Sequence, residues 1–64
     1  MAMVRSIAQE YLDVIYKIGH GEFRGKRELH WLEGQRGLLH DQLERLTGKR
    51  MTVAVARRLA ARSR

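Results

Sequence analysis

The chain of 64 residues contains neither cysteine nor proline. Without cysteine it has no disulfides and no thiolate metal ligands to stabilise a small fold. A domain of this size buries only about 60% of the surface that its unfolded chain exposes, so a lone core is marginal. We therefore expect association with a second copy to supply stability. The absence of proline means that no helix is forced to break.

Long apolar runs are also missing. The longest stretch without a charged residue is MTVAVA, far short of the ~20 apolar residues that cross a bilayer. The first residues contain no apolar run typical of a secretory signal. These absences favour a cytoplasmic protein that does not bind a membrane.

Acidic residues are missing from one part of the chain only. Residues 1–48 contain seven lysines and arginines and seven acidic residues, which cancel. Residues 49–64 contain six cations and no acid, and so carry the whole formal charge of +6 at pH 7. A neutral body with a cationic end predicts two separate tasks: folding or pairing in the first part, and contact with an anion in the second.

Residues 4–18 have the period of an amphipathic helix, with charged and amide side chains on the other face. Ser6 and Gln9 match a capping box at its start. Lys17 in the last turn and Gly19 just beyond favour its end there. The apolar positions are Val4, Ile7, Ala8, Tyr11, Leu12, Ile15, Tyr16 and Ile18.

Residues 26–46 carry a second helical seam, after a loop with three glycines in residues 19–25. Gly34 and Gly37 interrupt this seam, and each costs about 1 kcal/mol against alanine inside a helix. The two glycines could mark a turn between short helices, but the seam keeps its phase across them, which favours one helix. Gly48 is suited to end it. The seam comprises Leu29, Leu32, Leu39, Leu43 and Leu46, beside Trp31 and Leu38.

Residues 52–63 predict a third, shorter helix that Thr52 can cap, although MTVAV also has strand propensity. At about 100° per residue, Arg50, Arg57 and Arg64 fall on one stripe beside two small alanines. Guanidinium groups bind phosphate through two parallel hydrogen bonds, and small neighbours allow a close approach to a duplex backbone.

These segments together predict an all-α fold in a single domain of residues 1–64. The two longer helices form an antiparallel hairpin over residues 4–46 that also serves association, and residues 49–64 add a short basic helix. One hairpin alone leaves large apolar side chains in water, so we expect a homodimer.

The basic end favours a non-catalytic nucleic-acid-binding protein, in particular a small dimeric regulator, because paired basic helices suit two half-sites on DNA. Arginine also reads guanine edges in the major groove, which favours DNA over RNA. The alternative is a small helical inhibitor or adaptor whose basic end docks on an acidic protein. A merely solvated basic face and an amphipathic membrane helix are further interpretations. The expected contacts are Lys49, Arg50, Arg57, Arg58, Arg62 and Arg64.

Other candidate residues give weaker signals. His20, His30 and His40 are ten residues apart, which does not place two ligands on one helix face, so we expect no metal. The chain shows no nucleophile arrangement, carboxylate pair or phosphate-binding loop, so we expect no catalysis, cofactor or small-molecule substrate. The acids expected at solvated helix positions are Asp13, Asp41 and Glu44.

The four aromatic residues suggest packing more than recognition. Trp31 and the two tyrosines stand at helical spacing, which favours the core or a dimer interface over a base-stacking platform. Residues 23–27 form a cationic loop with one aromatic, an arrangement that single-strand binders use. We nevertheless favour an ordinary loop with Phe23 folded onto the core.

Two stretches resemble parts of nucleic-acid-binding families. LEGQRGLLHDQLERLTGKRMTV resembles the helix–GxxG–helix–strand segment of a KH domain, in which the GxxG loop clamps a nucleic-acid backbone. QLERLTGKRMTVAVARRLA resembles the helix–turn–helix half of ribbon-helix-helix repressors. His40 stands where the first family has an aliphatic residue, and GEFRGKRELHW does not alternate like the strand that the second family requires. We therefore assign the chain to neither family.

Overall fold

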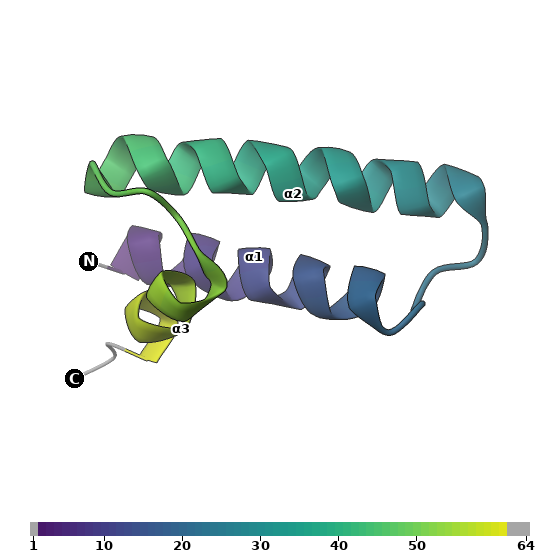
Figure 1. The fold of residues 1–64 in the computed structure, drawn as a ribbon, viewed down its shortest axis with the longest axis horizontal. Helices are drawn as coiled ribbons and strands as arrows, with labels where there is room; N and C mark the ends of the chain where they lie inside the picture. The colour runs from purple at the N-terminus through teal and green to yellow at the C-terminus, as the bar shows by residue number, and fades with distance from the viewer. Residues whose placement is uncertain (1, 62–64) are drawn as a thin grey trace.

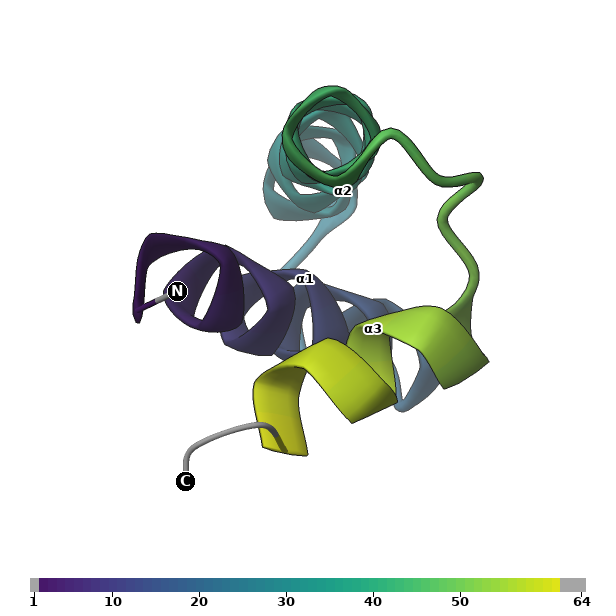
Figure 2. The ribbon, with the colours of Figure 1, turned by 90° about the vertical axis from the view of Figure 1, so that its left-hand side faces the viewer.

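The computed structural model describes residues 2–61, which fold into three α-helices. They are α1 (Ala2–Gly19), α2 (Lys26–Thr47) and α3 (Val53–Ala61). α1 and α2 lie side by side and run in opposite directions (Figure 1), and α1 lies between α2 and α3 (Figure 2). The described residues contain no strand, which confirms the predicted all-α character. None of these helices is long and apolar enough to cross a membrane.

The first helix begins earlier than its apolar pattern predicted, at Ala2. Ser6 therefore lies inside the helix, and its predicted capping box with Gln9 is wrong. The residues before Ser6 include no glycine or proline that would stop the helix from extending backwards.

The end of α1 is a Schellman motif. Gly21 adopts the left-handed conformation, with φ of 67°. Its N–H donates to the Ile18 carbonyl at 3.3 Å, and the N–H of Glu22 donates to the Lys17 carbonyl at 2.8 Å. The chain therefore turns at Gly21, two residues beyond the predicted stop at Gly19, because only the later glycine takes the positive φ.

α2 is continuous across Gly34 and Gly37, as its unbroken seam predicted. The GxxG loop that the KH resemblance implied is therefore absent, since both glycines are helical. A Cβ at either position would meet nothing within 4 Å, so neither glycine is a close-packing point. The helix ends at Thr47, where Gly48 takes φ of 68° and confirms the predicted stop.

The core is a single cluster that all three helices and the α2–α3 linker supply. Its members from α1 and α2 lie on the predicted apolar faces except Val14, which the predicted positions did not include, and Met51 joins from the linker. Phe23 packs against this cluster, which confirms that it is folded onto the core. The buried residues are Ile7, Ala8, Tyr11, Val14, Leu32, Leu39, Leu43, Met51 and Ala56.

Two aromatic side chains are not in this core. Tyr11 is buried as expected, whereas Tyr16 and Trp31 are exposed. Consecutive side chains of an α-helix point about 100° apart. Trp31 therefore points away from the buried side of α2, which holds Leu32 and Leu39, and lies on the outer face of the helix. The predicted core positions of Trp31 and Tyr16 are therefore wrong, and their place in a dimer interface stays a prediction.

Replacing Gly34 and Gly37 with alanine should stabilise the fold by about 1 kcal/mol at each position, because alanine is the better helix former and its methyl group has space. Thermal unfolding should show a midpoint higher by about 4–8 °C per kcal/mol. Gly48→Ala is the control and should destabilise, because its φ of 68° strains any side chain. A lower midpoint for the Gly34→Ala/Gly37→Ala variant would contradict a continuous, unobstructed helix.

Tyr11 should make stability depend on pH in the alkaline range. Burial is the main cause that raises the pKa of Tyr11 above 10.0, with nearby Arg36 lowering it and Glu44 raising it. The folded state therefore retains the phenol proton longer than the unfolded chain does, so this contribution is complete below pH 10 and is lost as pH rises above it. Urea unfolding over an alkaline pH series should show a smaller loss for Tyr11→Phe than for wild type. Tyr16→Phe, at an exposed position, should follow wild type.

Candidate functional site

The linker of residues 48–52 contains the start of the basic segment, residues 49–64, and is held by local hydrogen bonds. The N–H of Gly48 donates to the Glu44 carbonyl at 2.8 Å. The N–H of Lys49 donates to Thr47 Oγ1 at 3.2 Å. The N–H of Met51 donates to the Glu44 carboxylate at 2.8 Å. These bonds fix the backbone on both sides of Arg50, so its side chain starts from a defined position.

Thr52 caps α3, as the sequence predicted. Its Oγ1 accepts the N–H of Val55 at 3.2 Å, and its carbonyl accepts the N–H of Ala56 at 2.9 Å. Ala56 is fully buried, which fixes the rotation of α3 about its axis. The stretch MTVAV is therefore a cap followed by a helix rather than a strand.

The predicted contact residues within the described part of the chain are all exposed. Lys49 and Arg50 belong to the linker, whereas Arg57 and Arg58 lie on α3. None of the four forms an ion pair with another residue of the range 2–61. Their charges are thus available to an external anion.

The predicted stripe of arginines is wrong at its first member. Arg50 precedes α3, which begins three residues later, so helical spacing does not relate it to Arg57. The physical reason is the cap at Thr52, which starts the helix after itself. Arg64, the third member, and Arg62 lie outside the described residues.

Arg57 and Arg58 face different surroundings, because consecutive helical side chains point about 100° apart. Arg57 lines a pocket of about 380 Å³ between α1 and α3, together with Tyr16 and His20. Arg58 lines a pocket of about 200 Å³ together with Lys49. The structure thus brings one linker cation together with one α3 cation, and it places Arg57 apart from them.

Tyr16 and His20 were missed as candidate site residues. Their rings stack with centroids 3.9 Å apart and planes inclined by 23°. His20 Nδ1 donates to the Tyr16 carbonyl at 2.9 Å, which holds the imidazole against the phenol ring. Their spacing of four residues within and just beyond α1 is the signal that could have found the pair.

A second cationic group lies at the other end of α2, next to the α1–α2 loop. Arg24, Arg27 and Trp31 line a pocket of about 570 Å³ there. The sequence indicated a cationic loop at this place but assigned its aromatic residue to Phe23. The four-residue spacing of Arg27 and Trp31 would have indicated that these two side chains share a helix face.

His40, Asp41 and Glu44 form a cluster whose donor atoms lie within 4.8 Å of one another. Asp41 Oδ1 is 3.6 Å from Nδ1 of the imidazole, and Glu44 Oε2 is 3.6 Å from Nε2. The two carboxylates approach different ring nitrogens, and an imidazole binds a given ion through one of its two nitrogens. Glu44 also accepts the N–H of Met51, so its expected role as a simple solvated position is wrong.

Comparison of the chain with models of known protein families, with curated protein sequences and with solved structures gives no match.

Removing the cap of α3 should lower the stability of the fold. Thr52→Ala leaves the N–H of Val55 without its side-chain acceptor and should cost about 1 kcal/mol of stability. Denaturant unfolding should show the loss, and Thr52→Ser, which retains the hydroxyl, should recover most of it. Equal stability of the alanine and serine variants would show that the hydroxyl does not hold α3.

Proposed function

We propose that this protein is a non-catalytic nucleic-acid-binding protein whose basic linker and α3 contact phosphate groups. The observation that carries the proposal is the set of exposed cations at residues 49–58, which form no ion pair within residues 2–61. No acidic residue follows Glu44 in the sequence, so nothing in this segment cancels their charge. A polyanion is the partner that best satisfies such a segment.

The chemistry of the side chains supports phosphate as the anion. Three of the four described cations are arginines, whose planar guanidinium groups match phosphate oxygens with two hydrogen bonds. Ala54 and Ala61 are exposed on α3, and such small side chains allow a close approach of the helix to a backbone. Arginine also recognises guanine edges, and on this basis we infer DNA over RNA as the target.

The proposal includes a homodimer that presents two basic segments. α1 and α2 would act as a helical hairpin for association, because Met3 on α1 and Leu46 on α2 are large, apolar and exposed. Burying such side chains against a second copy is favourable by about 1.5–3 kcal/mol for each one fully buried. Two basic segments in one dimer would contact two stretches of the same duplex.

Binding to duplex DNA should depend strongly on salt. If the six cations of residues 49–64 all contact phosphate, log K should fall with log salt concentration with a slope of about −5 for each bound chain, at about −0.9 per contact. Arg57→Gln/Arg58→Gln should reduce the steepness of this slope by about 2. Fluorescence anisotropy of a labelled duplex over a salt series measures both values.

A matched double variant distinguishes binding at this site from a general effect of positive charge. Arg36→Gln/Arg45→Gln removes the same charge from exposed positions on α2 and should leave the slope near its wild-type value. Equal slopes for the two double variants would contradict a site on α3. Failure of the wild-type chain to bind either DNA or RNA at low salt would overturn the proposal and favour an acidic protein as the partner.

A further inference from the structure

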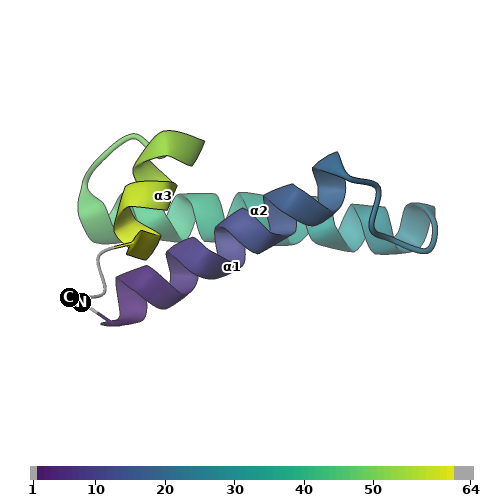
Figure 3. The same cartoon turned by 90° about the horizontal axis from the view of Figure 1, so that it is seen from below.

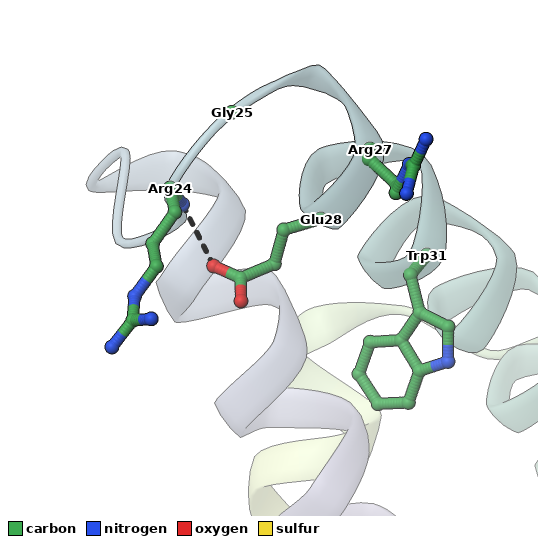
Figure 4. Close-up of a pocket in the computed structure, with 5 residues that line it drawn as sticks. All are labelled: Arg24, Gly25, Arg27, Glu28 and Trp31. Carbon is green, nitrogen blue, oxygen red and sulfur yellow. Dashed lines mark hydrogen bonds between the residues drawn. The ribbon is translucent and has the colours of Figure 1, made fainter.

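A pocket beside a cationic group lies where the α1–α2 loop enters α2 (Figure 4). It has a volume of about 570 Å³, within the range of roughly 300–1,000 Å³ that small-ligand sites occupy. Its lining residues are Arg24, Gly25, Arg27, Glu28 and Trp31. α2 has 22 residues and a length of about 33 Å at 1.5 Å per residue, and this pocket and the basic linker lie at its opposite ends.

Trp31 is the main apolar surface of this pocket. It is 62% exposed, although a tryptophan has more apolar area to bury than any other side chain. It is the only tryptophan of the chain, and the core is complete without it. An indole held in water at the edge of a pocket offers a flat face on which another ring can stack.

The charged groups around Trp31 have defined places. Glu28 Oε1 accepts the N–H of Arg24 at 2.8 Å, which ties the loop to the first turn of α2. In Figure 4, Glu28 lies between Arg24 and Trp31, and Arg27 extends from the turn above Trp31. Neither guanidinium forms an ion pair within residues 2–61. Gly25 contributes no side chain and therefore leaves the pocket open beside the loop.

We propose that this pocket binds an unpaired nucleotide of a single-stranded nucleic acid, an inference that rests on the proposed function. The base stacks on Trp31, as bases stack on aromatic side chains in single-strand binders. Arg24 and Arg27 bind the phosphates on either side of that base. Glu28 accepts a hydrogen bond from an exocyclic amino group, the contact that a carboxylate makes with cytosine.

Three features together favour a nucleotide in a strand over other ligands. The aromatic face suits a ring, the two guanidinium groups suit phosphates, and the net charge of the lining residues is positive. A duplex buries its bases in the stack and offers no free ring face to Trp31. The pocket therefore adds a preference for unpaired nucleotides to a basic segment that binds phosphate in either form.

The test uses the emission of Trp31 in the full-length protein. Titration with a single strand of about 16 nucleotides, the upper site size for one small binding fold, should quench this emission to saturation. The matching duplex should bind, through the basic segment, with little quenching. A free nucleoside triphosphate at the same nucleotide concentration should also give little, because it lacks the contacts at the other end of α2.

Substitutions at the pocket should distinguish the contribution of base stacking to single-strand affinity from the contribution of positive charge. Trp31→Leu should lower the affinity for the single strand by about 5- to 150-fold, the range for loss of one stacked base, and should leave duplex affinity unchanged. Trp31→Tyr keeps a stacking ring and should recover most of the affinity. Arg27→Gln should weaken single-strand binding more than Arg45→Gln, which removes the same charge from the far end of α2.

Each contrary result has a distinct meaning. Absence of binding to both strand and duplex overturns the proposed function together with the pocket. Binding to both with unchanged Trp31 emission, or equal affinities for wild type and Trp31→Leu, overturns the pocket assignment alone. Equal quenching by the nucleoside triphosphate assigns the pocket to free nucleotides and overturns a strand site. A lower molecular mass of Trp31→Leu by light scattering would assign Trp31 to a dimer interface and also overturn the proposal.

Discussion

The packing of α1 between its two neighbours is the constraint on which the rest of the molecule depends. Ala8, Leu43 and Ala56 come from the three helices, belong to one cluster and are fully buried. α3 has nine residues, too few for an isolated helix to be stable in water. Its contact with α1, seen from below in Figure 3, is therefore what keeps its arginines on a defined surface.

The cations of this protein are largely left to solvent. Within residues 2–61, Lys17 is the only lysine or arginine that forms an ion pair, with Asp13 at 3.2 Å. The other positive side chains are not neutralised in this way, so their field extends from the surface over a Debye length of about 8–10 Å. Such a distribution costs some self-repulsion and is favourable when an anion binds.

The two cationic ends of α2 differ in chemistry, and this difference gives them different roles in the proposals. The basic linker and α3 present arginines beside small alanines, which suits a phosphate backbone. The pocket at Trp31 combines two arginines with an exposed ring and a carboxylate, which suits a base. Phosphate contacts position a nucleic acid, whereas a stacked base discriminates between its paired and unpaired forms.

The sequence by itself determined the three helices, the Gly48 stop, the Thr52 cap and the charge of the basic end, because these follow from side-chain period and local backbone chemistry. The start of α1 was missed because the sequence has no local stop signal before Ser6. The role of Glu44 was missed because it depends on a hydrogen bond to Met51, seven residues away. Only the tertiary structure decided that Trp31 is exposed beside Arg24 and Arg27, that Arg58 lies near Lys49, and that Arg57 faces Tyr16 and His20. Periodicity shows which apolar side chains share a helix face. The packing of α1 decides which of these side chains are buried and which remain available for binding.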